Sequence, residues 1–323
     1  MNMALSIVVP TCRRPELLNR CLQSLTRQVF DPKGYEIVIA NDKPDAGVQA
    51  AVYRWQLAVQ YPRIRYVPVR DGRGPAAARN RGWRAACGEI VAFTDDDTRP
   101  IEEWLINGWK AMQQDVVAAW GYVRVPLPPN PTDYELDASG LDGAEFVTAN
   151  CFVQRTALVA LGGFDERFTA AWREDSDMYF SLGRLGRVVY APGAVVLHPI
   201  RPAPWGVSIS QQRKVLFDAL LFKKHPQLYR QKLLAAPRWN YYAAVATLCA
   251  IPVAAVAGMP MLAGVAAAAW LGITAHFCWR RLRRTSRAPS HVAEMIVTSA
   301  LIPPLSVFWR LAGSFKFRVA FIG

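Results

Sequence analysis

Three consecutive aspartates, Asp95, Asp96 and Asp97, follow the apolar run Ile-Val-Ala-Phe of residues 90–93. A run this apolar predicts a strand that is buried on both faces, as in parallel sheets. Because successive side chains of a strand alternate between its faces, we expect Asp95 and Asp97 to point one way and Asp96 the other. Two carboxylates at the end of such a strand suit Mg²⁺ or Mn²⁺ with a substrate phosphate. A solvated acidic turn is the alternative, but the apolar strand favours the metal site.

A second acidic cluster, Glu174, Asp175 and Asp177, stands at the start of a helix that is predicted to run to about residue 185. Carboxylates in the first turn of a helix are stabilised by the helix dipole. Capping of this helix is therefore the alternative to a catalytic role. The spacing alone does not decide between the two.

Strands and helices alternate over the first 113 residues and predict the frame that positions these acids. The predicted strands are 6–10, 35–40, 64–69 and 89–94, and the predicted helices are 15–28, 46–59, 75–87 and 101–113. This alternation predicts an α/β fold with a Rossmann-like, mostly parallel sheet flanked by helices.

The alternation becomes less regular after residue 113. Further strands are predicted at 116–125, 148–153, 187–191 and 194–198, with a short helix at 156–161. Residues 126–143 contain the run Pro-Leu-Pro-Pro-Asn-Pro. We interpret them as a long loop of the kind that covers a substrate.

The net charge of +13 is distributed very unevenly along the chain. Residues 1–205 contain 23 Lys and Arg against 23 Asp and Glu, whereas residues 206–323 contain 15 against 2. Residues 206–238 alternate basic and apolar residues, and we interpret them as an amphipathic segment on an anionic membrane surface. The basic residues adjoin apolar segments and match no nucleic-acid module, so no nucleic-acid partner is expected.

Residues 239–279 form an uncharged stretch of 41 residues, about twice the ~20 that one membrane-spanning helix requires. The pattern predicts a helical hairpin, with 241–257 leading out, a turn at 258–260 and 261–279 leading back. Arg238 and the basic cluster 280–284 flank the hairpin, which predicts that both of its ends are cytoplasmic. A buried, alanine-rich helix pair in a soluble domain is the alternative.

A third apolar segment, 292–309, is interrupted by Pro303-Pro304 and is interpreted as re-entrant or interfacial. Three regions follow: a domain at 1–205, the basic segment at 206–238, and membrane-associated helices at 239–323. The six dispersed cysteines show no zinc spacing and indicate a reducing compartment. The opening apolar run, residues 5–9, has its charges after it, unlike a signal peptide. We therefore expect a protein of the cytoplasmic membrane whose first domain faces the cytosol.

In sequence order, these motifs resemble the family 2 glycosyltransferases, which have the GT-A fold. The resemblance covers residues 5–199. It rests on Ser-Ile-Val-Val-Pro-Thr at 6–11, Ile-Ala-Asn-Asp-Lys-Pro-Asp at 39–45, Gly-Pro-Ala-Ala-Ala-Arg-Asn-Arg-Gly at 74–82, the aspartates 95–97 and the pair Glu174-Asp175. Asn41-Asp42-Lys43 departs from the Asp-Asp-Gly-Ser that is common in the family.

The resemblance implies that the donor is a nucleotide-diphosphate sugar. Asp97 would bind the metal on the diphosphate, while Asp95 would lie against the ribose. Arg79 would be a second cation at the diphosphate, with a surface salt bridge as the alternative. The base and ribose site would be lined by Pro10, Thr11 and Asp42.

On the acceptor side, the resemblance implies that Asp175 is the general base of an inverting transfer. Glu174 and Trp172 would contact the acceptor, although Trp172 could equally be a core residue. His198 lies where some relatives have a metal or diphosphate ligand, and a packed or capping histidine is the alternative.

The motif Gln-x-x-Arg-Trp of processive synthases is absent, since residues 211–214 are Gln-Gln-Arg-Lys. This favours transfer of a single sugar to a membrane-held acceptor, either a lipid-linked glycan or a lipid. Two alternatives remain. A sugar nucleotidyltransferase would require a glycine-rich first loop, which residues 11–14 lack, and a non-catalytic scaffold would be expected to have lost the carboxylates.

Overall fold

The computed structural model describes residues 3–70, 72–113 and 115–323 and divides the chain into two compact units. The sheet unit contains the chain up to Pro126 together with Ser139–Ile200. The helical unit contains Leu127–Ala138 and Arg201–Gly323. The sheet unit therefore ends close to the boundary expected at residue 205, but a short internal segment belongs to the helical unit.

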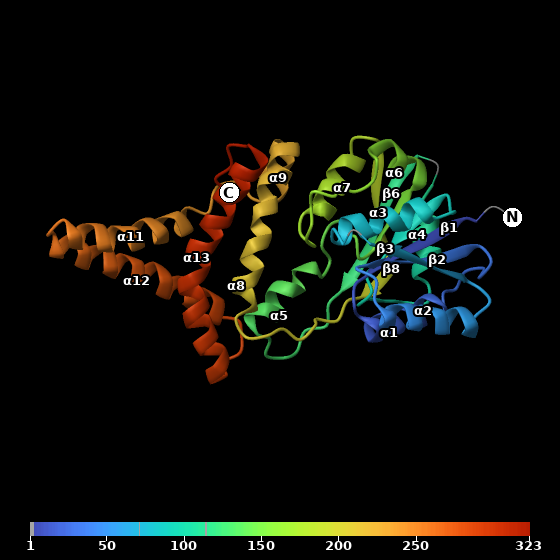
Figure 1. The fold of residues 1–323 in the computed structure, drawn as a ribbon, viewed down its shortest axis with the longest axis horizontal. Helices are drawn as coiled ribbons and strands as arrows, with labels where there is room; N and C mark the ends of the chain where they lie inside the picture. The colour runs from blue at the N-terminus through green and yellow to red at the C-terminus, as the bar shows by residue number, and fades with distance from the viewer. Residues whose placement is uncertain (1–2, 71, 114) are drawn as a thin grey trace. The chain divides into compact units, whose positions relative to one another are not determined.

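The described residues of the sheet unit form one eight-stranded sheet in the order β3-β2-β1-β4-β7-β6-β8-β5 (Figure 1). The strands are β1 (Leu5–Thr11), β2 (Tyr35–Asp42), β3 (Arg63–Val69), β4 (Ile90–Phe93), β5 (Arg99–Pro100), β6 (Val116–Arg124), β7 (Cys151–Gln154) and β8 (Arg187–Leu197). β1 pairs in parallel with β2 on one side and with β4 on the other. The chain thus reverses its strand order next to β1, where open α/β sheets bind ligands. The predicted Rossmann-like sheet is confirmed.

Helices cover both faces of this sheet because its central strand β1 is buried on both sides. α1 (Pro15–Leu25), α2 (Ala46–Ala58) and α4 (Trp104–Ala111) pack with Ile7 and Val9 of β1. α3 (Pro75–Ala85), α6 (Arg155–Leu161) and α7 (Glu174–Leu182) pack on the opposite face with Val8. The alternation of buried side chains along β1 therefore sends α1 and α3 to opposite faces.

Residues 187–198 were expected as two strands but form the single strand β8, which pairs with β6 through an irregular register. The Asn150 side chain compensates for the irregularity. Its Nδ2 donates to the carbonyls of Tyr122 at 3.0 Å and Ala194 at 2.8 Å. The strand continues because a buried amide replaces the missing ladder bonds.

Residues 126–143 are not the continuous loop that was expected. They contain α5 (Asp133–Ala138) and the 3₁₀ turn Ser139–Leu141. α5 begins with a capping box, in which Glu135 Oε2 accepts from Thr132 N at 2.7 Å and Thr132 Oγ1 accepts from Glu135 N at 3.2 Å. The Thr-x-x-Glu spacing predicts such a helix start, and the prolines before it concealed the signal.

A partly buried ion pair holds this segment, Leu127–Ala138, within the helical unit. Arg281 donates to Asp133 Oδ2 from Nη2 at 2.7 Å and from Nε at 3.1 Å, and to Thr298 Oγ1 at 2.6 Å. His291 Nε2 accepts from the Asp133 amide at 3.0 Å, and its Nδ1 lies 2.8 Å from the Ser286 carbonyl. Because Nε2 accepts, Nδ1 carries the proton and His291 is neutral. We call residues 127–138 the strap.

The other helices of this unit lie C-terminal to residue 206. They are α8 (Val207–Gln211), the 3₁₀ turn η2 (Gln212–Val215), α9 (Leu216–Lys224), α10 (Pro226–Lys232), α11 (Trp239–Val256), α12 (Pro260–Leu282) and α13 (Pro289–Phe317). The basic segment is thus broken into short pieces. In α9 every residue from Leu216 to Leu221 is buried, Asp218 included, so α9 is not the one-sided surface helix that was expected.

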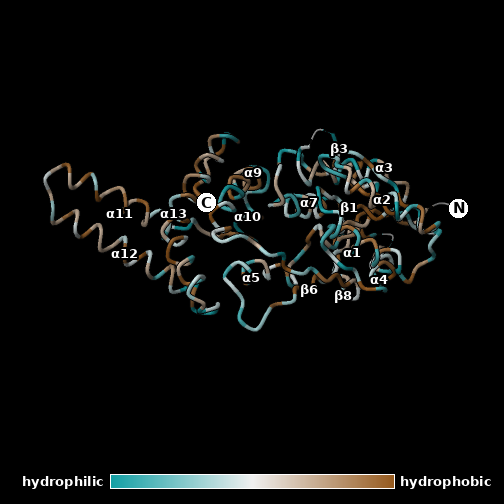
Figure 2. Tube along the Cα trace, turned by 60° about the horizontal axis from the view of Figure 1, so that its bottom comes forward, coloured by the Kyte–Doolittle hydropathy of each residue, from teal (hydrophilic) through white to brown (hydrophobic). Residues whose placement is uncertain are grey.

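The predicted hairpin is present as α11 and α12, and its two helices are long and apolar enough to cross a membrane. Figure 2 shows the apolar residues that dominate both helices. Among the described residues, α13 is a third such helix. It continues through Pro303 and Pro304, so the expected interruption there is wrong. Each proline removes one hydrogen bond and crowds the preceding turn, and the packing of Ile302, Pro303 and Ser306 holds the helix together.

The strap provides a test of this arrangement. Asp133→Ala leaves the partly buried Arg281 without its carboxylate, which should destabilise the strap by about 1.5 kcal/mol. We expect faster proteolytic cleavage between Leu127 and Ala138 in the full-length protein in detergent. Asp115→Ala is the control, because the Asp115–Arg187 pair is exposed. Equal cleavage in the two variants would contradict the role of the ion pair.

Candidate active site

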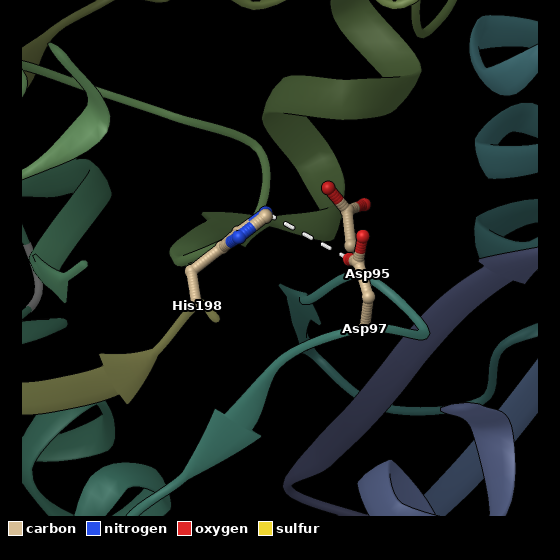
Figure 3. A group of neighbouring side chains, drawn as sticks. All are labelled: Asp95, Asp97 and His198. Carbon is tan, nitrogen blue, oxygen red and sulfur yellow. Dashed lines mark ion pairs between the residues drawn. The ribbon is translucent and has the colours of Figure 1, made fainter. Parts of the chain in front are cut away.

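Asp95, Asp97 and His198 form a group in which one ligand atom from each lies within 4.8 Å of the others. Figure 3 shows the two carboxylates and the imidazole converging from separate elements, with 3.7 Å between His198 Nε2 and Asp97 Oδ1. The topology explains the convergence. β5 follows Asp97 and pairs with the end of β8, where Arg99 lies opposite Leu197, so His198 comes next to the acids.

Asp96 points away from this group, as predicted. Its carboxylate accepts from Thr11 Oγ1 at 2.7 Å and from Arg14 Nη1 at 3.3 Å, and burial raises its pKa to about 6. The aspartates lie in the turn after β4, which Thr98 holds by donating to the Asp95 carbonyl at 2.7 Å. Since the Thr11 hydroxyl donates to Asp96, its proposed contact with a nucleotide stays a prediction.

Arg79 joins the first acidic cluster to the second. It is only 2% exposed and comes from the middle of α3, so the surface salt bridge considered as an alternative is wrong. Its Nη2 donates to Asp95 Oδ1 at 2.8 Å and its Nη1 to Glu174 Oε1 at 3.1 Å. α3 reaches β1 closely because Gly82 faces Val8, where a Cβ would come within 2.4 Å of a methyl group. A diphosphate contact by Arg79 stays a prediction.

Glu174 and Asp175 are the first two residues of α7, and their environments differ. Glu174 is buried, and its Oε2 has no hydrogen-bond partner among the described residues. Burial, followed by the charge of Asp175, raises the pKa of Glu174 to about 7. Asp175 is half-buried, and its Oδ1 accepts from Ser176 N at 2.7 Å. One oxygen of Asp175 therefore accepts from the next amide within the first turn of α7, which is compatible with a catalytic role for the other.

The carboxyl ends of β1, β2 and β3 border an open cleft of about 500 Å³. It is lined by Arg13, Lys43, Pro44, Gln49, Tyr66, Pro68 and Arg70. Asp42 accepts from Gly74 N at 3.2 Å, while its buried Oδ1 has no partner among the described residues. Asn41 likewise has an unpartnered buried Oδ1, and its Nδ2 donates to Tyr66 at 3.1 Å. The cleft residues and Asn41 were missed in the sequence. There, this turn was marked only by the departure of residues 41–43 from the Asp-Asp-Gly-Ser common in family 2 glycosyltransferases.

Two further predicted residues take simple positions. Pro10 is buried at the end of β1, where it pairs with Ala40. Trp172 is half-buried, with the Arg173 guanidinium 4.5 Å from its ring centroid, so it is not a fully buried core residue. Contacts of either residue with substrates stay predictions.

Comparison with known proteins identifies the architecture. The sequence profile described as Glycosyl transferase family 2 matches residues 6–144. Glycosyltransferase AglE of Haloferax volcanii is 24% identical over 225 residues, or 65% of this chain and 71% of AglE. The chain contains a family 2 glycosyltransferase domain.

A second relative supports this assignment, and a solved structure shows the same fold. The GalNAc(5)-diNAcBac-PP-undecaprenol beta-1,3-glucosyltransferase of Campylobacter jejuni is 34% identical over 122 residues, which cover 38% of this chain and 36% of that protein. A mannosyltransferase of Pyrobaculum calidifontis, solved with GDP-Man and Mn²⁺, superposes with a TM-score of 0.59 at 18% identity. The superposition covers 97% of this chain and 86% of the other. The glycosyltransferase therefore has the expected GT-A fold.

The donor set of the group fits a divalent cation. Carboxylate oxygens suit Mg²⁺ and Mn²⁺, and an imidazole nitrogen is accepted more readily by Mn²⁺. Neighbouring ligands of an octahedral ion at about 2.1 Å are roughly 3 Å apart, so the 3.7 Å between His198 and Asp97 requires only a small adjustment. Asp175 and His198 lie beyond the profile match, so their place in the site rests on geometry.

The pKa of Glu174 generates a test. Its pKa is about 7 in the folded protein against an ordinary value of 4.5, so the folded state binds this proton more tightly than the unfolded chain. This contribution to stability is complete below pH 4.5 and is lost as the pH rises through about 7. In Glu174→Gln the contribution is absent. We expect its Tm to fall less than that of the wild type between about pH 5 and pH 8. The exposed Glu16→Gln is the control, and parallel Tm profiles for Glu174→Gln and the wild type would refute the assignment.

Proposed function

We propose that this glycosyltransferase moves one sugar from a nucleotide-diphosphate sugar to a membrane-held acceptor, with inversion and with the help of Mg²⁺ or Mn²⁺. The observation that supports this most directly is the group Asp95, Asp97 and His198 at the carboxyl end of the sheet. A carboxylate pair at the start of α7 is linked to this group through Arg79.

On the donor side, Asp97 and His198 would hold the cation and Asp95 would lie against the ribose. The cation, when bound, neutralises charge that develops on the departing diphosphate, so the leaving group need not be protonated. Asp42, Pro10 and Thr11 would line the base and ribose site. The unpartnered Oδ1 of Asp42 is suited to accept a hydrogen bond from the nucleotide.

On the acceptor side, Asp175 would take the proton of the attacking hydroxyl. A carboxylate suffices because the hydroxyl becomes acidic only as the new bond forms. Burial raises the pKa of Asp175, which makes it a stronger base than an exposed aspartate. Attack from the face opposite the nucleotide inverts the anomeric centre. Glu174 would contact the acceptor and would also hold the start of α7 through Arg79, and Trp172 would lie against the acceptor.

Two observations support a membrane-held acceptor. Three helices of the described chain are long and apolar enough to cross a membrane. The name of the C. jejuni relative specifies an undecaprenol-linked substrate. Arg238 and the basic cluster after Trp279 favour a cytosolic glycosyltransferase domain. The absence of Gln-x-x-Arg-Trp favours a single addition over polymer synthesis.

Asp97→Ala tests the role assigned to the metal group. UDP-glucose and GDP-mannose are tested as donors. For the donor that the wild type binds, we expect the variant to lose Mn²⁺-dependent binding and to release no nucleotide from the sugar donor. Loss of the cation's stabilisation corresponds to several kcal/mol. Donor affinity by calorimetry with Mn²⁺ and with EDTA is the measurement, and Asp115→Ala is the control. Undiminished turnover in EDTA would exclude a metal-assisted reaction.

Asp175→Asn separates an enzyme from a scaffold and catalysis from capping. Asparagine keeps the size and the capping ability of the side chain but cannot accept the acceptor's proton. Nucleotide release should fall by roughly 10²–10⁴-fold, with donor affinity and Tm nearly unchanged. A wild type that releases no nucleotide from any sugar donor would favour the scaffold. Formation of a nucleotide sugar from a sugar phosphate would favour a nucleotidyltransferase. An active, stable Asp175→Asn variant would remove Asp175 from the mechanism.

A further inference from the structure

α13 is long enough to cross a bilayer, but its length does not decide whether it does. It has 29 residues and is therefore about 43 Å long, against roughly 30 Å for the hydrocarbon core. The neighbours on each of its faces are more informative.

The two faces of α13 have opposite character. Its buried face is partly polar and includes Met295, Thr298, Ser299, Ile302, Ser306 and Arg310. Its exposed face is apolar and consists of Ile296, Val297, Leu301, Phe308, Leu311 and Phe315, of which Phe315 is 89% exposed. We call these six residues the apolar stripe. A helix that is apolar towards the outside and partly polar towards the protein is suited to contact lipid.

The buried face is accompanied along its length by residues 205–224. At its start, Trp205 Nε1 donates to the Ser290 carbonyl at 3.2 Å and Gly206 N to Glu294 Oε1 at 2.8 Å. At its end, Lys223 Nζ donates to the Phe317 carbonyl at 2.8 Å.

The middle of α13 is packed against the same segment. The Arg213 guanidinium lies 5.7 Å from the Trp309 ring centroid, and Arg310 lies 3.6 Å from Asp218. Gly313 approaches α9 so closely that a Cβ there would come within 2.5 Å of the Leu216 carbonyl. α13 and residues 205–224 therefore form one packed layer.

This layer is incompatible with a membrane-spanning α13. If α13 crossed the bilayer, α8, η2 and α9 would have to cross beside it, yet they contain only 5, 4 and 9 residues. Their ends would leave backbone groups in hydrocarbon. They would also bring Arg213, Lys214, Lys223 and Lys224 into the membrane, where cations are costly.

The hairpin lies on the other side of α13. In both Figure 1 and Figure 2, α13 separates the α11–α12 hairpin from α9 and runs across the hairpin's open end. The apolar stripe is on the face of α13 opposite its buried face. The buried face also contacts the open end of the hairpin, where Arg281 donates to Thr298 and Ser299 and Tyr241 packs with Ile302. Trp239 and Trp279 are exposed at the hairpin's open end, next to Arg238 and Arg280, as at a membrane interface.

We propose that only the α11–α12 hairpin inserts into the membrane and that α13 lies in the plane of the membrane surface, with its apolar stripe in contact with lipid. The proposal rests on the membrane attachment proposed above. It gives the chain one inserted hairpin and one interfacial helix in place of three spans.

Depth measurements test the orientation of α13. The six native cysteines of the full chain are first replaced. One cysteine is then introduced at a time and labelled with a nitroxide, at Val297, Leu301, Phe308 or Phe315. The protein is reconstituted in vesicles of phosphatidylethanolamine and phosphatidylglycerol. Positions 297 and 315 are about 27 Å apart along the helix, yet we expect all four labels at one shallow depth and a label at Val265 of α12 much deeper. Deep labels at 301 and 308, with 297 and 315 at opposite surfaces, would overturn the proposal.

Lysine substitutions test the same point without labels. Leu301→Lys is expected to leave the carbonate-resistant fraction unchanged, because lysine at a membrane surface is tolerated. Val265→Lys in the hairpin is the matched control and should reduce this fraction. Equal loss in both variants would overturn the interfacial position. If carbonate instead extracts the wild-type protein from membranes, the proposed membrane attachment itself is refuted.

Discussion

Arg79 lies between two carboxylates from distant parts of the sequence, Asp95 after β4 and Glu174 at the start of α7. Three acidic side chains crowd this region, and two of them follow each other in α7. Carboxylates cannot be withdrawn from water together unless a cation compensates them. The guanidinium has two terminal nitrogens in a fixed fork and binds each carboxylate through a separate nitrogen. The relation between the metal group and Asp175 therefore depends on this buried contact.

The shortest strand of the sheet, β5, likewise brings together residues that are distant in the sequence, here at the group Asp95, Asp97 and His198. β5 consists of two residues, and its pairing with the end of β8 brings His198 back to the aspartates about 100 positions before it. On the opposite edge of the site, Gly74 adopts a left-handed conformation at the start of α3 and donates its amide to Asp42. Backbone contacts at the ends of the strands thus position His198 and Asp42.

The strand and helix alternation up to residue 113 was predictable because each element has a strong apolar pattern and a turn after it. The positions of Asp95, Asp97 and the pair at α7 were predictable for the same reason, since each follows or begins such an element. His198 could be named but not placed, because its position depends on a pairing between β5 and β8 that no local pattern encodes. The cleft residues Arg13, Lys43 and Arg70 were missed, since exposed basic residues in turns have no distinctive spacing. The helix α13 was misjudged at Pro303-Pro304, where tertiary packing overrides local propensity.

The strap makes the helical unit discontinuous in sequence, since Leu127–Ala138 is held by Arg281 and His291 about 150 residues further on. The chain therefore passes between its two units three times instead of once. A recombination event with a single crossover near residue 200 would join a strap from one parent to helices from another. The ion pair would then survive only if both parents supplied matching partners. Exchange of membrane regions between glycosyltransferases of this kind thus requires two compatible segments to be inherited together.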